Sequence, residues 1–202
     1  MVRENNRPHL LDAAEAIVIE EGAARLTLDA VARRAGVSKG GVLYHFPNKD
    51  ALLGALVERM TDAFEALVSG AATKTDDTAT GRLQAYVHAC DAADQRLGQI
   101  SCALLPALFE NRALLAPMRE FYRKHYQRLK RLPIGFEQGA IVTLALDGMW
   151  MMEMLGVSQL TPAQEKRIKR MLSAMAVESL PLEGVESGPR RRVPSRTGTK
   201  RR

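Results

Sequence analysis

Residues 36–53 read GVSKGGVLYHFPNKDALL, and this stretch decides the fold. It places two adjacent glycines, Gly40 and Gly41, in the first turn of a short apolar-periodic segment. Each glycine in a helix costs about 1 kcal/mol relative to alanine, so a helix that only filled a core would gain nothing from this choice. The glycines therefore indicate a helix surface that another molecule approaches closely.

Outward from this stretch, the sequence predicts an all-α protein. Apolar residues recur at spacings of three and four, and no alternating β-branched run bounded by turns interrupts them. We expect helices at 8–21, 28–35, 39–45 and 49–68, and further helices near 82–97, 100–112, 115–131, 137–155 and 162–178. The expected caps are Asn6, Thr27, Ser38 and Asn48, and residues 69–81 are the expected loop.

The second and third of these helices have the spacing of a helix-turn-helix. Val31, Ala35 and Val42 would turn inward, and Gly36 can take the positive φ of a tight turn. A recognition helix enters the major groove with its N-terminal residues leading, so small residues there give it room. The residues left on the outer surface, which we expect to face DNA, are Ser38, Lys39, Gly40, Gly41, Tyr44 and His45.

Several positions around this motif suit contacts with phosphate. Thr27 and Ser38 stand at helix N-termini, where a hydroxyl and free backbone N–H groups attract an anion, although both are equally explained as caps. Lys49 stands in a first helical turn, where the helix dipole disfavours a cation, and a phosphate partner would account for it. Tyr44 and His45 keep an alternative as residues that pack or orient the next turn.

The run TLDAVARRAGVSKGGVLYHFPNKDALLGAL, residues 27–56, resembles the DNA-binding segment of TetR-family transcriptional regulators. The shared features are the threonine at the second helix, the Gly-Val turn, the Tyr-His-Phe triplet and the lysine of the fourth helix. The resemblance implies phosphate contacts from Thr27, Tyr44, His45 and Lys49, and groove-facing positions at 38–41. It also implies a variable helical domain that dimerises and binds an inducer. Leu43 departs from the pattern, because many members have a second tyrosine there.

The positive charge of the chain is concentrated at its C-terminus. Of the net charge of +6, residues 1–60 contribute zero, residues 61–182 contribute +1 and residues 183–202 contribute +5. We expect this basic tail to be disordered, and it serves either as an accessory contact to DNA phosphates or only as a solubilising terminus. No apolar run is long enough to cross a membrane and no signal-peptide pattern opens the chain, so we expect a cytoplasmic protein without a membrane partner.

The C-terminal two thirds offers material for a homodimer interface. Residues 141–156, IVTLALDGMWMMEMLG, are apolar nearly all round, so this helix should be buried in the core or between subunits. Gly148 permits close helix approach. With residues 168–177, the segment is our candidate for a four-helix interface made of two helices from each chain.

The same region offers candidates for a ligand pocket, each with an alternative as ordinary core. They are Tyr86, His88, Cys90, Phe109, Met118, Tyr122, Asp147, Trp150 and Met151. Asp147 and Trp150 lie three residues apart, so one helix face would present a carboxylate beside an indole and suit a cationic aromatic ligand. The alternative is that Asp147 and Glu153 pair with arginines such as Arg112, Arg119 or Arg123, or across a dimer.

Catalysis and metal binding are not supported by the sequence. An enzyme could use Asp147 and Glu153 as acid and base, but no metalloprotease helix, nucleophile elbow or phosphate loop is present. Cys90 and Cys102 suit neither a disulfide framework nor a zinc motif and predict small buried thiols. We therefore expect no metal, no cofactor and no enzymatic activity.

These observations together predict three parts and one function. The parts are a helix-turn-helix DNA-binding domain at 1–54, a helical ligand-binding and dimerisation domain at 55–179, and the basic tail at 180–202. We expect a regulator of transcription that binds a double-stranded DNA operator as a repressor and is released by a small-molecule inducer. The alternative is a DNA-binding regulator without a small ligand, controlled by a protein partner or by its abundance.

Overall fold

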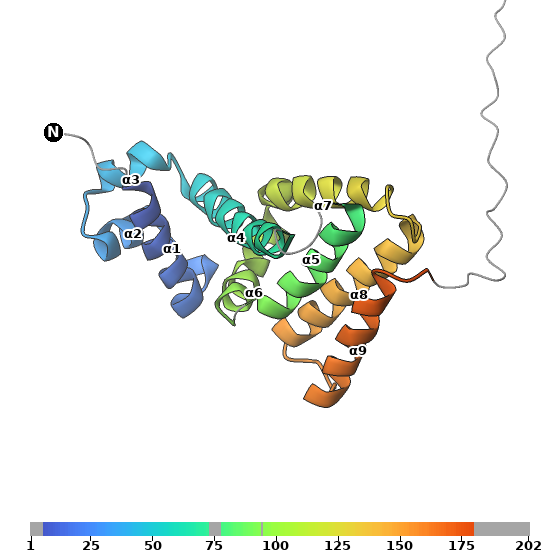
Figure 1. Cartoon of the computed structure of the whole chain (residues 1–202). Helices are drawn as coiled ribbons and strands as arrows, with labels where there is room; N and C mark the ends of the chain where they lie inside the picture. Colours follow the sequence, from blue (N-terminus) through green and yellow to red (C-terminus); the bar gives the residue numbers. More distant parts are fainter. Residues whose placement is uncertain (1–5, 73–77, 94, 180–202) are drawn as a thin grey trace, which may run out of the picture.

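The computed structural model describes residues 6–72, 78–93 and 95–179, and every regular element in these residues is helical, as expected. The elements are α1 (Arg7–Glu21), η1 (Ala23–Arg25), α2 (Leu28–Ala35), α3 (Lys39–His45), α4 (Lys49–Ala72), α5 (Ala79–Ala92), α6 (Gln95–Glu110), η2 (Arg112–Leu115), α7 (Ala116–Leu129), α8 (Phe136–Met154) and α9 (Pro162–Met175). Figure 1 shows α1 to α3 gathered at one end of the molecule, and α4 leading from them into the bundle of α5, α7, α8 and α9. The helix-turn-helix therefore lies at one end of the molecule, where it is accessible to an elongated binding partner.

The first helix differs from the expectation in how it begins. Asn6 does not cap α1, because its backbone is already helical and its side chain makes no capping hydrogen bond. Pro8 lies in the first turn, where its missing N–H costs nothing. The helix ends as expected at Gly22, whose φ of 88° only glycine adopts without strain.

The boundaries around the first long loop are shifted. The helix α4 continues to Ala72, into the segment expected to be a loop, and α5 begins at residue 79 instead of 82. The start of α5 is fixed by Thr78, whose Oγ1 accepts a hydrogen bond of 3.0 Å from the Gly81 N–H. The helix α5 ends at Ala92 and α6 begins at Gln95, so residues 95–97 belong to α6.

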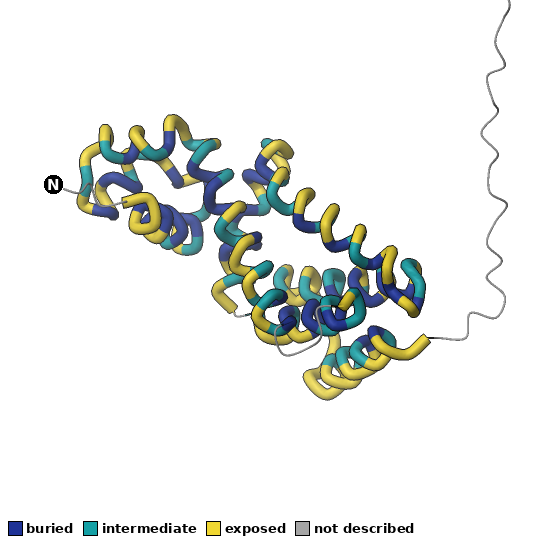
Figure 2. The backbone as a smooth tube through the Cα atoms, turned by 45° about the horizontal axis from the view of Figure 1, so that its top comes forward, coloured by how far each residue is buried: buried dark blue, intermediate teal, exposed yellow. Residues whose placement is uncertain are grey.

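Buried side chains form two clusters, and α4 contributes to both. The first unites α1 to α3 with Leu52 and Leu56 of α4 and with Ile100 and Leu104 of α6. The second unites the end of α4, at Val68 and Ala72, with α5, α7, α8 and α9. Figure 2 shows the buried positions on the inner sides of both groups, with α4 running between them. The domain division at residue 54 stays a prediction, because α4 passes through it without a break.

Three further expectations concern exposure and position. Cys102 is exposed, so the prediction of a buried thiol is wrong for this residue, while Cys90 is half-buried. In the described part of the chain, no helix combines the length and the hydropathy that crossing a membrane requires. The basic tail falls on residues outside the described ranges.

Candidate functional site

The helix-turn-helix forms because each of its boundaries is specified locally. At the turn, Gly36 adopts the left-handed conformation with φ 68° and ψ 27°, which a side chain would disfavour. Val31 and Val42 are fully buried and Phe46 is 2% exposed, so these side chains fix the angle between α2 and α3. Val37 is half-buried and packs at the edge of the same cluster.

Three side chains cap the helices of this motif. Thr27 Oγ1 accepts a hydrogen bond of 3.1 Å from the Ala30 N–H, and Ser38 Oγ accepts one of 3.1 Å from the Gly41 N–H. Asn48 Oδ1 accepts one of 2.8 Å from Ala51 N–H at the start of α4. The capping role of Thr27 and Ser38 is thus confirmed. Their contact with phosphate stays a prediction compatible with it, because free N–H groups remain in each first turn.

The glycines of α3 are not required by the packing of this chain. A Cβ placed on Gly40 would meet only Ser38 Oγ, at 3.8 Å. A Cβ on Gly41 would make ordinary contacts, at 3.5 Å with Ser38 Oγ and at 3.8 Å with Val37 Cβ. Because α3 has room for alanine at both positions, packing within the described residues does not explain the glycines, and close approach to DNA at these positions stays a prediction.

The exposed face of α3 carries its charged and aromatic groups. Lys39 Nζ lies 3.0 Å from Asp29 Oδ2, and both side chains are more than half exposed. Tyr44 is 73% exposed, and its ring meets that of His45 edge to face with centroids 5.0 Å apart. Leu43 is 41% exposed beside them. Lys39 is therefore held at the surface by a solvated ion pair that a stronger partner can displace.

Lys49 has a structural partner that the sequence did not indicate. Its Nζ donates a hydrogen bond of 3.2 Å to the carbonyl oxygen of Ala24 in η1. This contact ties the start of α4 to the segment before α2, and it accounts in part for a cation at a helix N-terminus. Because an ammonium group has three donors, one carbonyl leaves Lys49 able to reach a phosphate oxygen.

Sequence reasoning missed a basic groove beside Thr27. The groove has a volume of about 590 Å³ and is lined by Ile17, Glu21, Ala24, Arg25, Thr27, Ala30, Arg33 and Arg34. Arg34 is engaged with Glu20 through hydrogen bonds of 2.7 Å and 2.5 Å. Within the described ranges, Arg25 and Arg33 form no ion pair, so they can bind an anion. Their signal in the sequence is weak, because arginines on a helix surface are usually only solvated.

The second candidate site is a cavity of about 80 Å³ between α4, α5, α6, α7 and α8. Six of the nine pocket residues predicted from the sequence line it: Tyr86, Cys90, Met118, Tyr122, Asp147 and Trp150. The others that line it are Met60, Thr61, Phe64, Leu97, Ser101 and Phe121. Sequence reasoning missed the contribution of α4, because none of the predicted pocket residues lies on that helix. Ligand binding by these residues stays a prediction.

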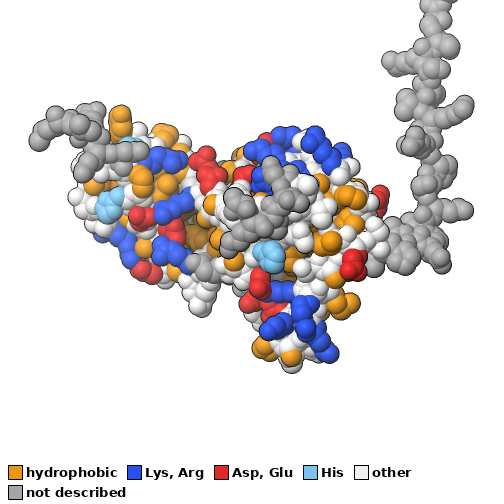
Figure 3. All heavy atoms as spheres, in the orientation of Figure 1, with side chains coloured by type: hydrophobic (Ala, Val, Ile, Leu, Met, Phe, Trp, Pro, Cys, Tyr) orange, Lys and Arg blue, Asp and Glu red, His pale blue; other side chains and the backbone are white. Residues whose placement is uncertain are grey.

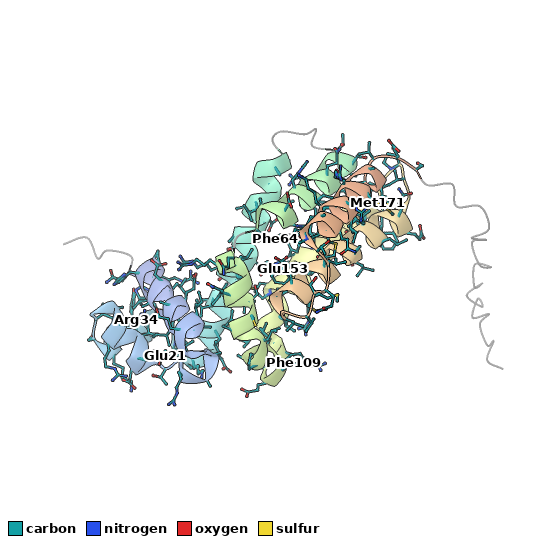
Figure 4. The ribbon with its side chains drawn as sticks, turned by 90° about the horizontal axis from the view of Figure 1, so that it is seen from below. Glu21, Arg34, Phe64, Phe109, Glu153 and Met171 are labelled. Atoms are coloured by element: carbon teal, nitrogen blue, oxygen red, sulfur yellow. The ribbon has the colours of Figure 1, made fainter. Side chains whose placement is uncertain are left out.

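Three predicted pocket residues lie elsewhere. Phe109 is 75% exposed, and Figure 4 shows it well away from the cavity residue Phe64. Met151 is 52% exposed on the outer side of α8. His88 lines a surface groove between α5 and α9. These three side chains do not reach the cavity, because helical spacing alone does not tell which side of α5, α6 or α8 faces inward.

Asp147 is the centre of the cavity's hydrogen bonding. The Tyr86 hydroxyl donates to its Oδ1, and the Tyr122 hydroxyl donates to its Oδ2 at 2.9 Å. The alternative that Asp147 pairs with an arginine is wrong within the chain: in the described ranges Asp147 has no ion pair, and Arg123 is instead engaged with Glu120. Pairing across a dimer stays a prediction. Three helices meet at this carboxylate, since Tyr86 lies on α5, Tyr122 on α7 and Asp147 on α8.

Burial shifts the proton affinity of the groups around Asp147. It raises the pKa of Tyr86 and Tyr122 well above the usual range, with the nearby Asp147 charge adding to the effect. It raises the pKa of the Cys90 thiol to about 12, again with a contribution from Asp147. The pKa of Asp147 itself is raised by burial and lowered in part by the two tyrosine hydroxyls. Both tyrosines and the thiol are thus neutral donors at neutral pH.

Comparisons with known proteins agree with the geometry of both regions. Residues 10–56 match the family described as bacterial regulatory proteins of the tetR family, and residues 80–177 match the tetracyclin repressor-like C-terminal domain. The HTH-type transcriptional regulator BetI of Burkholderia mallei is 30% identical over 164 residues, which span 74% of this chain and 82% of that regulator. The chain belongs to the TetR family of transcriptional regulators.

Solved structures show the same fold as this TetR-family chain. A TetR-family member from Streptomyces coelicolor superposes with a TM-score of 0.68 at 22% identity, covering 85% of this chain and 98% of that one. The multidrug binding protein EbrR in complex with malachite green gives a TM-score of 0.64 at 22% identity, covering 85% and 98%. The resemblance found in residues 27–56 is thus confirmed, and the protein is a transcriptional regulator and not an enzyme.

The outer face of α8 in this TetR-family chain is apolar and uncovered. Ile141 is 52% exposed, Leu144 is 60% exposed and Leu155 is 50% exposed, while Val142 and Leu146 on the opposite face are buried. A Cβ placed on Gly148 would meet nothing within 4 Å. Met171 is 65% exposed on α9, which packs beside α8, and Figure 4 shows it on the outside of the bundle. The sequence predicted that this helix is buried either in the core or between subunits. Burial within the chain covers only one of its faces.

Proposed function

We propose that this chain is a homodimeric repressor that binds an operator through α3 and is released by a small molecule bound in the cavity. The observation that carries the proposal is the position of α4. Its first half supplies Leu52 and Leu56 to the core of the helix-turn-helix, and Met60 and Phe64, one and two turns later, line the cavity. A change in the cavity and a change in the DNA-binding end are therefore changes in one helix.

The DNA-binding roles follow from the surface of α3 and its surroundings. Lys39 contacts a base edge or a phosphate in the major groove, with Gly40 and Gly41 providing the clearance for α3 to enter. Thr27, Ser38, Tyr44, His45 and Lys49 contact phosphates, and Arg25 and Arg33 add to the same surface. These contacts hold the register of α3 on the duplex. Repression further requires that the operator overlaps a promoter.

Dimerisation is supported by the uncovered face of α8. A soluble monomer rarely leaves a continuous row of large apolar side chains such as Ile141, Leu144 and Leu155 in water. Packing α8 and α9 of two subunits into a four-helix interface covers that row on both chains at once, as two-fold symmetry requires. The dimer also places two copies of α3 for half-sites about one DNA turn apart.

Release follows from the size of the cavity. A volume of about 80 Å³ is below the roughly 300–1,000 Å³ typical of pockets for drug-sized ligands. A ligand larger than the present cavity has to move lining residues, among them Met60 and Phe64 of α4. The ligand then favours a conformation in which the spacing of the two α3 helices no longer matches the half-sites. The size of this shift equals the difference between the ligand's binding free energies for the two conformations.

The small cavity also favours a second candidate function. A regulator without a small ligand, controlled by a protein partner or by its abundance, would need no larger cavity. The two functions are distinguished by a small molecule that binds the purified protein and lowers its affinity for the operator. In both cases the protein acts in the cytoplasm, where the chromosome lies.

The test is fluorescence anisotropy with labelled DNA from the intergenic region upstream of the gene. The purified protein is titrated at several salt concentrations onto this duplex and onto a scrambled duplex of the same composition. Tight binding to the upstream duplex that depends on a palindrome supports the repressor. Equal and steeply salt-dependent binding to both duplexes contradicts specific binding at this site and indicates contacts with phosphates alone.

A further inference from the structure

The carboxylate of Asp147 is half-buried and has no positively charged partner among the described residues. Its two oxygens accept hydrogen bonds from Tyr86 and Tyr122, and in the described part of the chain no lysine or arginine lies within ion-pair distance. Tyrosine hydroxyls stabilise the ionised form but leave its charge uncompensated. A carboxylate kept in this state is the group that an incoming cation would neutralise.

The rest of the cavity wall suits a cation that carries no hydrogen-bond donors. Phe64, Tyr86, Phe121, Tyr122 and Trp150 line it with aromatic rings, and Asp147 is the one charged residue among the described lining residues. Phe64 and Tyr86 meet edge to face, with centroids 5.5 Å apart. Aromatic faces attract a cation through their quadrupoles, and quaternary ammonium groups are bound in this way.

The hydroxyl groups of the wall already use their donors within the chain. Thr61 Oγ1 donates to the Val57 carbonyl oxygen at 2.8 Å, and Ser101 Oγ donates to the Leu97 carbonyl oxygen at 2.6 Å. A primary ammonium group brings three N–H donors, and among the described lining side chains few acceptors remain for them: the Asp147 carboxylate and the lone pairs of these two hydroxyl oxygens. A quaternary ammonium group brings none, and therefore matches a wall that offers one carboxylate and several rings.

We propose that the cavity binds an organic cation of the quaternary ammonium class, with Asp147 as its counter-ion and the surrounding aromatic rings as its walls. The proposal rests on the proposed function, because it names the chemical class of the inducer. The volume of about 80 Å³ limits the group seated there to a compact head such as trimethylammonium. Any larger substituent has to extend out of the cavity or move the lining residues of α4.

An open groove beside the cavity provides the way in. It is lined by Ile19 of α1 and by residues of α5, α6, α8 and α9, has a volume of about 810 Å³, and shares Cys90 and Trp150 with the cavity. Its charged groups are Lys169, which pairs with both Asp91 and Glu165, and Glu153, which has no ion-pair partner among the residues that the structure describes. The groove is therefore net negative and attracts cations toward Trp150.

The experiment measures binding to the full-length protein without DNA. The charged probe is tetramethylammonium chloride, and the neutral probe of similar shape is tert-butanol, with sodium chloride added to equalise ionic strength. Trp150 is the single tryptophan of the chain and lines the cavity, so its emission reports on this site directly. The shift in Tm with probe concentration gives an independent affinity, because a ligand that binds the folded state raises Tm.

Two variants separate charge from structure. Asp147→Asn keeps the size of the side chain and its ability to bond with Tyr86 and Tyr122, but it removes the negative charge. Asp62→Asn removes a charge from an exposed position on α4, next to the lining residue Thr61, and is the matched control. We expect tetramethylammonium to bind wild type and Asp62→Asn at least about tenfold more tightly than tert-butanol, and Asp147→Asn to lose that preference.

Two results would overturn the proposal. In the first, tetramethylammonium and tert-butanol bind wild type equally. In the second, a folded Asp147→Asn protein binds tetramethylammonium as wild type does. Operator binding distinguishes failure of the cation proposal from failure of the proposed function. If a neutral compound releases the wild-type protein from DNA, ligand-controlled repression is supported and only the proposal of a cationic ligand is rejected. A protein that is released by no compound of either charge contradicts both.

Discussion

Lys49 and Lys39 should differ in what they contribute to DNA binding, because the structure places them differently. Lys49 Nζ lies 3.2 Å from the Ala24 carbonyl oxygen, at the edge of the motif, whereas Lys39 stands at the start of α3, where Asp29 is its one partner among the described residues. Replacing Lys49 by methionine keeps the apolar stem and removes one phosphate contact from each subunit. Since each contact contributes about 0.9 to the slope of log K against log salt, a dimer should lose about 1.8.

Lys39→Met should change specificity instead. A good contact to a base edge discriminates by about 1–3 kcal/mol, so the ratio of operator to scrambled-duplex affinity should fall by about tenfold or more. The salt slope should change less than in Lys49→Met. Lys130→Met, at the end of α7, removes the same charge far from the motif and should alter neither quantity.

The assay is a salt series of anisotropy titrations on operator and scrambled duplexes for all four proteins. Tm is measured in parallel, because the loss of the Lys49 hydrogen bond to Ala24 costs about 0.5–1.5 kcal/mol and must not unfold the motif. If Lys49→Met and Lys39→Met lower the affinity for both duplexes by the same factor and change the slope equally, the assignment of one to phosphate and the other to a base is refuted.

Three other predictions test the core, the dimer and the turn. Burial lowers the pKa of His125 from 6.5 to about 4, so below pH 6.5 the unfolded state binds a proton that the folded state does not. Stability should therefore fall by about 2 kcal/mol between pH 7.5 and pH 5, and urea unfolding should show this loss in wild type but not in His125→Gln. Leu144→Glu should give a folded monomer in analytical ultracentrifugation, because it adds a charge to both sides of the proposed interface. If the variant remains a dimer, this face of α8 is not the interface. Gly36→Ala should cost about 1–2 kcal/mol in the same unfolding assay, because φ is 68°, whereas Gly98→Ala in α6 should be neutral or stabilising.

The helix-turn-helix could be predicted from the sequence because its signals are local. Thr27, Ser38 and Asn48 each cap the helix that follows them, and Gly36 adopts the left-handed turn for which its residue type is suited. None of these features depends on residues far along the chain. The basic groove was missed because nothing local distinguishes Arg25 and Arg33 from arginines that are only solvated, and because Ile17 and Glu21 of α1 also line it.

The cavity could be predicted only in part, because its contacts join distant segments. Tyr86 and Asp147 are 61 residues apart, and their hydrogen bond depends on α5 packing against α8. Arg123, one of the arginines considered as a partner of Asp147, does not pair with it. It forms an ion pair with Glu120, three residues away on its own helix. The sequence of α8 therefore predicted that Asp147 lies at the cavity, but it did not predict that two tyrosine hydroxyls are its partners.

The shift of α6 by a few residues changes how the two regions are coupled. An α6 that begins at Gln95 presents Leu97 and Ser101 to the cavity, while Ile100 and Leu104 pack in the core of the helix-turn-helix. The helix α6 thus has the same dual position as α4, and two packed helices connect the regions instead of one. Because close-packed cores resist local deformation, a ligand that separates α4 from α6 cannot leave α1 in place, since α1 packs against both. Movement of α1 together with α2 and α3 as one unit is therefore the expected response, and it preserves the geometry of each recognition helix while changing the distance between the two.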